Sequence, residues 1–380
     1  MQLPELSLYI HLPWCQRKCP YCDFNSHEAR TIPETEYLAA LLRDLQSDLA
    51  LARGRMVQTV FIGGGTPSLF SADAIARLLD GVATSLTLAP DVEVTLEANP
   101  GSAEAQKFAG FRAAGINRLS LGVQSLDDAC LQALGRVHDS GQARQAIEYA
   151  LAAGFDSVNI DLMHGLPGQT PASAETDLRA ALAYAPSHLS WYQLTIEPNT
   201  VFHKRPPLLP LEDVLADIQQ AGEELLAAAG YRQYEVSAYS RPGKQCRHNL
   251  NYWTFGDYLG IGAGAHGKLS FAHRIVRQQR HRQPELYMDK ALAGAAVAQE
   301  HEVSRRELPF EYMLNALRLK DGFTLQDFIE KTGLPPNSVR GQLQKAEQSG
   351  WLEADGAWLR PTARGFDFLS DLQSLFLPDA

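Results

Sequence analysis

The chain lacks the features that would place it outside the class of soluble globular proteins. It has no apolar run of about 18 residues, so no transmembrane helix is expected. Its first residues, MQLPELSLYI, carry neither a positive n-region nor a cleavage site, so no secretory signal peptide is expected. Its five cysteines are few and clustered, which argues against a disulfide scaffold. We therefore expect a cytoplasmic protein.

An excess of positive charge is also absent. The 34 Lys and Arg residues face 44 Asp and Glu residues, and the formal net charge is -10. This balance argues against attraction of nucleic acid or of an anionic membrane by bulk electrostatics. The 45% hydrophobic and 21% charged residues are ordinary for a globular protein, and 380 residues suit a large domain plus a small one.

Three of the cysteines form a cluster near the start of the chain. Cys15, Cys19 and Cys22 have C-x3-C-x2-C spacing, which brings three thiolates together but supplies no fourth. A [4Fe–4S] cluster on three cysteines leaves one iron open for another ligand. The spacing alone leaves two alternatives. These are a redox pair, and a zinc site completed by His11, His27 or Asp23.

Up to about residue 200, apolar runs alternate with amphipathic segments. We predict six strands, in the runs LSLYIHL, VQTVFIGGG, VEVTLEANP, INRLSLGVQ, SVNIDLMHGLP and LSWYQLTIEP. We predict helices at residues 36–53, 72–83, 103–114, 143–153 and 174–185. Such alternation implies right-handed crossovers and a parallel sheet. Because six units are fewer than the eight of a closed barrel, the predicted fold is α/β, an incomplete (β/α)6 barrel.

Glycines and polar residues gather where these strands end. The ends read GGGTP, EANP, GVQS, DLMHGLPG and TIEPNT. The carboxyl ends of parallel strands meet at one rim, where the following loops build sites. The sequence therefore predicts a site at this rim.

We predict three parts: residues 1–235 as the partial barrel, 236–304 as a connecting segment, and 305–380 as a winged-helix-like α+β module. The connecting segment holds the motif H-N-x-x-Y-W and the basic run HRIVRQQRHR at 273–282. The last part has nine Lys and Arg against eleven Asp and Glu, and its would-be recognition helix offers only Arg340 and Lys345. We therefore expect it to pack or to act as a lid, with no nucleic-acid partner.

The cysteine spacing, the aromatic Tyr21 and the strand ending GGGTP together resemble the radical S-adenosylmethionine (SAM) superfamily. The resemblance implies a cluster whose open iron takes the amino and carboxylate groups of SAM. It also implies that an electron from the cluster cleaves the sulfonium to a 5′-deoxyadenosyl radical. Glycines beside the cluster let the backbone approach the amino group, since no Cβ stands in the way.

Within that superfamily, residues 5–200 resemble the oxygen-independent coproporphyrinogen III dehydrogenase group through GGGTPS, LEANP, GVQS, LGRVHD and IDLMHGLPGQT. Carried over by position, the residues beside cluster-bound SAM are Tyr9, Tyr21, Gly64 and Glu97. Those that match a second SAM position are Gly65, Thr66, Gln124, Arg136, Asp161 and Thr195. Carboxylates such as Glu97 and Asp161 suit the amino and ribose groups of SAM as acceptors.

Two departures separate the chain from that dehydrogenase group. The group has a further cysteine where this chain has Phe24, and it has a longer arm before the cluster loop. Conversely, the motif at residues 248–253 and the C-terminal part resemble the HemW heme chaperones. Imidazole can ligate heme iron and flat aromatic faces can cover a porphyrin, which makes His248, Tyr252 and Trp253 candidate heme residues. Arginines at 274–282 are candidate partners for propionates.

The resemblance implies a heme chaperone that binds heme, a [4Fe–4S] cluster and SAM, and passes heme to apo-hemoproteins such as respiratory cytochromes, with peripheral membrane contact. One alternative is the dehydrogenase itself, which decarboxylates coproporphyrinogen III by a radical route. A second alternative is a nucleic-acid-modifying radical SAM enzyme. Whether the chain catalyses a reaction stays open, as does its oligomeric state, with a cluster-induced dimer as one alternative.

Overall fold

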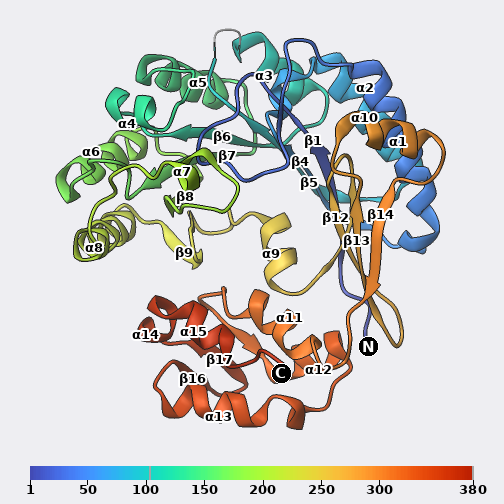
Figure 1. Cartoon of the computed structure of the whole chain (residues 1–380), viewed down its shortest axis with the longest axis vertical. Coiled ribbons are helices and arrows are strands. Elements are labelled where there is room, and N and C mark those ends of the chain that lie inside the picture. The colour runs from blue at the N-terminus through green and yellow to red at the C-terminus, as the bar shows by residue number, and fades with distance from the viewer. Residues whose placement is uncertain (102–103, 379–380) are drawn as a thin grey trace.

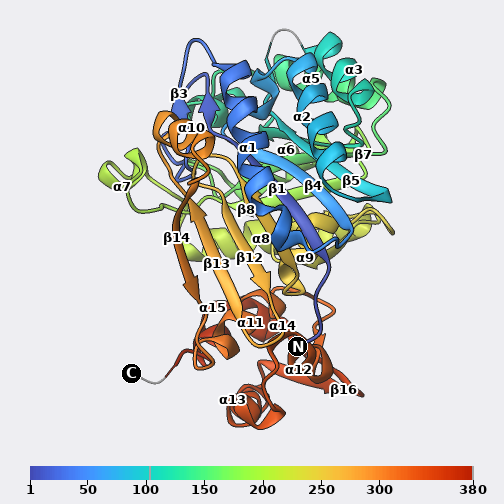
Figure 2. The same cartoon turned by 90° about the vertical axis from the view of Figure 1, so that its right-hand side faces the viewer.

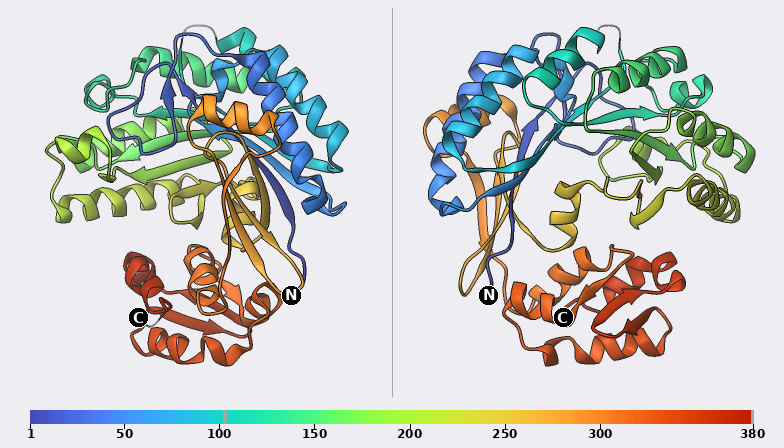
Figure 3. Two further views of the ribbon diagram at one scale, coloured as in Figure 1. Left: turned by 45° about the vertical axis from the view of Figure 1, so that its right-hand side comes forward. Right: turned by 180° about the vertical axis from the view of Figure 1, so that it is seen from behind.

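The computed structural model of the chain describes residues 1–101 and 104–378. One large sheet curves through the upper part of the molecule, with helices on its outer side (Figure 1). A smaller C-terminal module lies below the open side of that curve, as the view from behind also shows (Figure 3). No helix within the described ranges is both long and apolar enough to cross a membrane.

All six predicted strands are present, and they pair in parallel with one another. They are β1 (Leu6–Leu12), β4 (Val57–Gly64), β5 (Leu88–Ala98), β6 (Arg118–Gln124), β7 (Ser157–His164) and β8 (His188–Gln193). The sheet is not closed into a barrel by these strands, since β1 and β8 both pair onward with other strands. The prediction of an incomplete six-unit barrel is confirmed.

The predicted crossover helices are also present, with slightly different ends. They are α1 (Glu34–Ala52), α2 (Ala72–Ser85), α3 (Glu104–Ala113), α5 (Ser140–Ala152) and α6 (Pro171–Leu182). The first residue of the predicted helix 103–114, Ala103, lies outside the described residues. Helix α2 begins at Ser71, whose hydroxyl accepts a hydrogen bond from the amide of Ala74, as expected for an N-cap.

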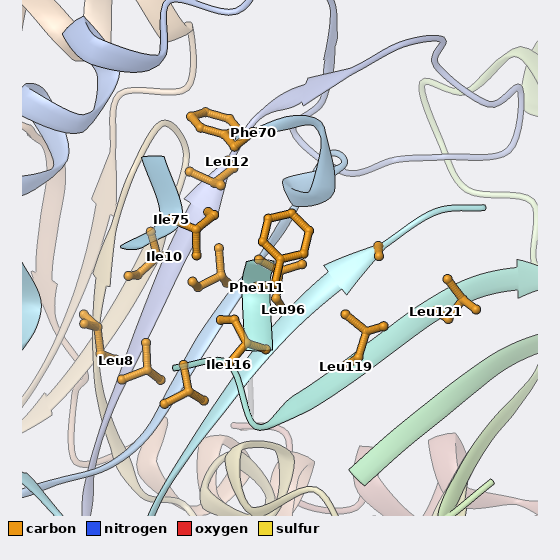
Figure 4. Packing of buried hydrophobic residues seen from close by; sticks show 14 of the residues in the cluster. Leu8, Ile10, Leu12, Phe70, Ile75, Leu96, Phe111, Ile116, Leu119 and Leu121 are labelled. Atoms are coloured by element: carbon orange, nitrogen blue, oxygen red, sulfur yellow. The ribbon is translucent and has the colours of Figure 1, made fainter. Parts of the chain in front are cut away.

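The main core lies between the sheet and these helices. Figure 4 shows Leu8, Ile10 and Leu12 of β1 on the same side as Ile75 of α2 and Phe111 of α3. All five are fully buried. Because side chains alternate along a strand, the opposite face of β1 carries Ser7, Tyr9 and His11. The apolar face therefore holds the helices, and the other face is left for polar groups.

Residues 232–304 supply six further strands, on both sides of the parallel unit. On one side β9 (Arg232–Glu235) and β10 (Ala238–Ser240) pair antiparallel next to β8; on the other, β11 (Asp257–Ile261) pairs in parallel with β1. The sheet continues antiparallel through β12 (His266–Ser270), β13 (Ile275–Arg280) and β14 (Val297–Glu302). The full order is β14-β13-β12-β11-β1-β4-β5-β6-β7-β8-β10-β9. The segment that we predicted to be a connection thus contributes five strands to the main sheet.

The basic run at 273–282 forms β13 and its flanks. Arg280 is fully buried and pairs with Asp44 and Asp48 of α1. Arg277 pairs with Glu311 and donates to the hydroxyl of Tyr258, 2.8 Å away. Both guanidinium groups thus already have acidic partners in the fold, buried ones for Arg280 and a half-buried one for Arg277, so neither is free for a propionate in this arrangement. They fasten α1 and the C-terminal module to the sheet.

The C-terminal module has its own core. Its elements are α11 (Leu308–Ala316), β15 (Phe323–Thr324), α12 (Leu325–Thr332), α13 (Arg340–Gln348), β16 (Leu352–Asp355), β17 (Trp358–Pro361), α14 (Ala363–Asp367) and α15 (Leu369–Ser374). The three strands form one antiparallel sheet, as expected for a winged-helix-like module. Phe255 and Ile275 of the main part join the module's core. The long strands β12 to β14 run down to it (Figure 2).

The remaining elements lie at the cysteine loop, beside the outer helices α1 and α6, and on the open side. The short strands β2 (Trp14–Cys15) and β3 (His27–Glu28) bracket the cysteine loop, and α4 (Asp128–Ala133) follows β6. The others are α7 (Val201–Lys204), α8 (Glu212–Ala228), α9 (Arg247–Trp253) and α10 (Pro284–Leu292). Helix α9 lies between the sheet and the C-terminal module (Figures 1 and 3).

Candidate functional site

The inner face of the sheet leads into one cavity of about 510 Å³. The cavity begins at the cysteine loop and the carboxyl ends of β4 to β8, and it extends to α9 and to Arg318 of the C-terminal module. Most of the residues predicted for the site line it. These are Cys15, Cys19, Tyr21, Cys22, Gly64, Gly65, Thr66, Glu97, Gln124, Arg136, Asp161 and Trp253.

The cysteine loop is tied into a compact turn by its two short strands. Strands β2 and β3 pair in parallel, and the amide of Ala29 donates to the carbonyl of Cys15 at 3.1 Å. Cys15 is buried, Cys19 and Cys22 are half-buried, and all three are free thiols. The loop therefore presents three sulfur atoms to one cavity.

A chain of hydrogen bonds connects two of these thiols. Thr66 donates to the sulfur of Cys15 at 3.5 Å and accepts from the amide of Asn99 at 2.9 Å. Arg136 donates to Asn99 at 2.7 Å and to the sulfur of Cys19 at 3.4 Å. Donors beside sulfur stabilise thiolates, which are the form that binds metal. The chain thus fixes the cysteine loop to the ends of β5 and β6.

The donor set fits an iron–sulfur cluster. Among the described residues, no three His, Cys, Asp or Glu side chains converge closely enough to hold a single metal ion. A [4Fe–4S] cluster takes each thiolate on a different iron, so its cysteines do not have to converge on one point as zinc ligands do. The three thiols around one cavity satisfy this weaker requirement.

The glycines after β4 leave no room for a side chain. A Cβ on Gly65 would lie 2.5 Å from the carbonyl oxygen of Trp14 in the cysteine loop. Gly64 has a φ of 121°, and a Cβ there would lie 2.6 Å from the ring of His11. Such contacts exclude any larger residue. The backbone of β4 therefore runs directly against the cysteine loop and lines the cavity.

Two carboxylates lie on the inner face without an ion-pair partner among the described residues. Glu97 of β5 accepts from the amide of Gly64 at 3.1 Å. Asp161 of β7 accepts from Ser120 at 3.0 Å and from Asn159 at 2.7 Å. Burial, and then the charge of Asp161, raise the pKa of Glu97 to about 7. Burial also raises the pKa of Asp161.

Buried carboxyl groups of this kind suit a positively charged ligand. A cation in the cavity would favour the ionised forms of Glu97 and Asp161, because it would offset the free-energy cost of burying their charge. The amino group and the sulfonium of SAM are both positively charged, and its ribose offers hydroxyl donors. The residues therefore fit SAM next to the cysteine loop.

Gln124 and Tyr21 complete this end of the cavity. Gln124 has a φ of 69°, an uncommon conformation for a residue other than glycine, and its side chain accepts from the hydroxyl of Tyr192. Tyr21 packs against Phe202 with ring centroids 6.3 Å apart. Arg136 also donates to the carbonyl of Gly122 at 2.8 Å.

Two of the predicted SAM residues do not line the cavity. The hydroxyl of Tyr9 lies 2.9 Å from Nδ1 of His11, and its ring stacks on Phe61. Tyr9 therefore lies behind the wall that Gly64 forms. Thr195 is exposed after the end of β8. The structure brings neither side chain to the space where the other eleven predicted SAM and cluster residues meet.

The H-N-x-x-Y-W motif forms α9, and its histidine is inside the protein. Nδ1 of His248 lies 2.7 Å from the hydroxyl of Thr59, and Nε2 lies 2.8 Å from the hydroxyl of Tyr252. The ring also stacks on Phe61 at 5.0 Å. Burial lowers the pKa of His248 to about 3, so the ring is neutral. In this arrangement both ring nitrogens already have hydrogen-bond partners, so neither is free to ligate iron.

The two aromatic residues of the motif share a small cavity, and one of them also meets the main cavity. Tyr252 lines a smaller cavity of about 200 Å³ together with Tyr258, Lys268 and Asn315. Trp253 lines both that space and the main cavity. Of the three residues that we predicted to bind heme, Trp253 is thus the one that meets the main cavity.

Sequence reasoning missed three residues at the site. Asn99 was visible only as part of the strand end EANP, and its role as a link between Thr66 and Arg136 appears in the structure. Glu235 and Arg318 also line the cavity, and they form an ion pair with 3.1 Å between Nη2 and Oε2. No local motif marks this pair, because the two residues come from different parts of the chain.

Comparison with known proteins gives matches along the whole chain. The family model described as the radical SAM superfamily matches residues 9–181, and that of the HemN C-terminal domain matches residues 303–368. The heme chaperone HemW of Escherichia coli (strain K12) is 50% identical over 100% of both chains. HemW of Haemophilus influenzae is 48% identical, over 100% of this chain and 99% of the relative.

A mitochondrial relative and a solved structure extend these matches. Radical S-adenosyl methionine domain-containing protein 1 of Bos taurus is 39% identical over 96% of this chain and 86% of its own. The solved structure of coproporphyrinogen III oxidase (HemN) from Escherichia coli has a TM-score of 0.83 and 24% identity. It covers 98% of this chain and 90% of its own. At that identity the likeness shows a shared fold.

Proposed function

The chain belongs to the family of HemW heme chaperones, and we propose that it binds heme and delivers it to apo-hemoproteins. The observation that carries this proposal is the 50% identity to a heme chaperone over the full length of both chains. The match spans the C-terminal module and residues 248–253, which hold the motif that the dehydrogenase group does not share. The single cavity that joins α9 to the cysteine loop is consistent with it.

The radical SAM superfamily implies a [4Fe–4S] cluster and SAM. We propose that Cys15, Cys19 and Cys22 hold the cluster. When bound, the cluster and SAM together supply one-electron chemistry at the sulfonium. The backbone of Gly64 and Gly65 would pass beside the methionine part of SAM, and Glu97 would accept from its amino group. Asp161 would accept from the ribose hydroxyls.

The other predicted SAM residues take supporting roles in this proposal. Thr66 and Arg136 hold the cysteine loop through the hydrogen bonds to Cys15 and Cys19. Gln124 and Tyr21 contribute cavity wall. Tyr9 acts through His11 behind that wall. Thr195, which is exposed at the rim, would meet SAM only at its outer edge.

Heme would lie against α9. Trp253 offers an aromatic face to the main cavity, which suits the flat porphyrin. His248 and Tyr252 lie one layer behind and hold α9 against β4 through Thr59 and Phe61. We therefore propose that Trp253 contacts heme and that His248 and Tyr252 are positioning residues.

Delivery and location complete the proposal. The recipients would be apo-hemoproteins such as respiratory cytochromes, reached from the cytoplasm by peripheral contact with the membrane. An apo-cytochrome mixed with the heme-loaded protein should gain heme, as seen in its absorbance after the two proteins are separated. Heme that stays on the donor, or that transfers equally from free solution, would overturn the chaperone role.

The rival function is oxidative decarboxylation of coproporphyrinogen III. Phe24 is 63% exposed at the place where the dehydrogenase group carries its additional cysteine, so the loop offers a ring there and no thiol. An anaerobic assay of the reconstituted protein with coproporphyrinogen III and SAM tests this function directly. We expect no vinyl product, together with stoichiometric heme uptake. Multiple turnovers to a vinyl product would show that the chain is an enzyme.

A further inference from the structure

Two hydrogen-bond donors at the far end of the main cavity have no acceptor. Nε1 of Trp253 and Nε of Arg318 are both buried, and neither donates to any atom of the described residues. Leaving a buried donor unpaired costs about 1–3 kcal/mol, so native proteins rarely leave two together. Both side chains line the main cavity. A ligand in that cavity is therefore the natural source of the missing acceptor.

The two side chains form one unit. The guanidinium group of Arg318 lies over the ring of Trp253, 4.2 Å from its centroid. Its Nη2 donates to Glu235, which is buried at the end of β9. Stacking and the ion pair fix the plane of the guanidinium group, so its remaining donors keep a defined direction. The unit joins α9, β9 and the turn after α11.

The charges along the cavity set which ligand group fits here. At the cysteine end, Glu97 and Asp161 form no ion pair among the described residues, and Arg136 already donates to Cys19, Asn99 and Gly122. At the α9 end, one carboxylate, Glu235, faces Arg318, whose guanidinium group has five N–H donors. A planar carboxylate with two oxygens matches a planar guanidinium group and a neighbouring indole N–H. An anionic ligand group is thus directed away from the cluster and toward Arg318.

We propose that Trp253 and Arg318 form a carboxylate-binding subsite that anchors a propionate of heme at the module end of the cavity. The subsite rests on the proposed function, which supplies a flat ligand with carboxylate arms. Arg318 takes the place of Arg277 and Arg280 as the candidate partner of a propionate. Those two arginines pair with Glu311 and with the aspartates of α1. Since Arg318 belongs to the C-terminal module, the module takes part directly in holding the ligand.

The test compares heme with heme dimethyl ester, whose propionates carry no charge. Both probes are titrated into the full-length protein with its cluster reconstituted, and binding is followed by absorbance and by quenching of tryptophan fluorescence. We expect the wild type to prefer heme over the ester by about tenfold, the worth of one charge-assisted hydrogen-bonded pair. Arg318→Gln should abolish this preference. Trp253→Phe, which keeps the ring but removes the N–H, should reduce it by about threefold.

A matched control is available at the same junction. Arg232 of β9 pairs with Asp321 of the module but lies outside the cavity. Arg232→Gln should therefore retain the full preference for heme. Arg318→Lys keeps a charge opposite Glu235 and serves as the second variant if Arg318→Gln unfolds. We expect it to bind heme with a reduced preference over the ester.

The outcomes separate the subsite from the proposed function. If the wild type binds heme and the ester equally, or if Arg318→Gln keeps the preference, the subsite is wrong while heme binding stands. If the wild type takes up neither probe, the proposed function fails and the subsite fails with it.

Discussion

The two ends of the main cavity are built in different ways. At the cysteine end, the groups come from the ends of neighbouring strands and from one short loop. They are joined through the hydrogen bonds of Thr66, Asn99 and Arg136. At the α9 end, Trp253, Glu235 and Arg318 come from three separate segments and meet through an ion pair and a stacked ring. The first end is local to the parallel sheet, whereas the second depends on how the C-terminal module docks.

This difference suggests a division of roles. The cysteine end presents thiols, tight glycines and unpaired carboxylates, which suit a negatively charged cluster beside a positively charged cofactor. The α9 end presents an aromatic face and an arginine, which suit a flat anionic ligand. Each end can therefore be altered separately, and the predictions below test that separation in order of decreasing effect.

The largest effect should follow replacement of a cluster cysteine. Cys19→Ser should abolish the brown absorbance of the reconstituted protein, because three thiolates are the minimum set that holds the cluster. Heme uptake should remain near one per chain, since the heme end does not depend on the loop. The matched control is Cys130→Ser, on α4 outside the loop, which should keep the absorbance. Loss of the cluster in Cys130→Ser would overturn the ligand assignment.

Two glutamates of β5 allow the two ends of the main cavity to be altered one at a time. Glu97 and Glu93 lie four residues apart on the same face of β5. Glu97 lies at the cysteine end, whereas Glu93 accepts from the amides of Arg247 and His248 at the start of α9. Glu97→Gln should weaken SAM binding by about tenfold to a hundredfold, the loss of one hydrogen bond to a charged group.

Glu93→Gln is the control for that substitution. It should leave the affinity for SAM, measured by equilibrium dialysis under anaerobic conditions, unchanged. It should instead loosen the start of α9, with faster amide hydrogen exchange at residues 247–253. Equal losses of SAM affinity in both variants would show that the two ends are coupled.

SAM binding should also depend on pH through Glu97. The pKa of Glu97 is raised to about 7, and a bound cation favours its ionised form, so binding releases a proton below that pH. Affinity should therefore rise by up to about tenfold per pH unit from pH 6 toward 7 and level off above it. Glu97→Gln should remove the slope. A slope that persists in this variant would assign the proton to another group.

The same shift has a consequence for the stability of the protein without SAM. The folded-state pKa of Glu97 lies above the ordinary value of 4.5, so the folded state binds this proton more tightly than the unfolded state. The resulting stabilisation is fully present below about pH 4.5 and is lost as the pH rises through about 7. SAM should therefore stabilise the protein most above pH 7, where Glu97 is ionised.

The parallel sheet and the cysteine end were largely predictable from the sequence, and the physical reason is locality. The alternation of side chains along a strand and the glycines at its end are local patterns, and they predicted all six strands. The spacing of the strand ends then placed Gly64, Glu97 and Asp161 at one rim. The positions of Tyr9 and Thr195 did not follow. A residue's place in a family pattern does not say whether its side chain reaches the cavity or stops behind its wall.

The α9 end was not predictable in the same way. The motif marked His248 as a candidate heme residue, but its environment is set by Thr59, nearly 200 residues earlier, which takes one of its ring nitrogens. The arginines of the run at 273–282 were candidate partners for propionates, yet the acidic partners of Arg280 lie on α1. Arg318 carried no signal at all. Long-range pairing decided each of these roles, and no local spacing reports it.

The smallest effect concerns the layer behind Trp253. His248→Ala removes a buried ring and leaves the Tyr252 hydroxyl without its partner, while Thr59 keeps its hydrogen bond to Ser7. The loss should lower the free energy of unfolding by about 2–4 kcal/mol. Tyr252→Phe removes one hydroxyl and should cost about 1 kcal/mol. If both residues only position α9, each variant should weaken heme binding by a few fold while the heme absorbance spectrum keeps its shape. If His248 ligates the iron, His248→Ala alone should shift that spectrum, because Tyr252→Phe leaves the imidazole in place. We expect the first result, since both ring nitrogens of His248 already have partners in the fold.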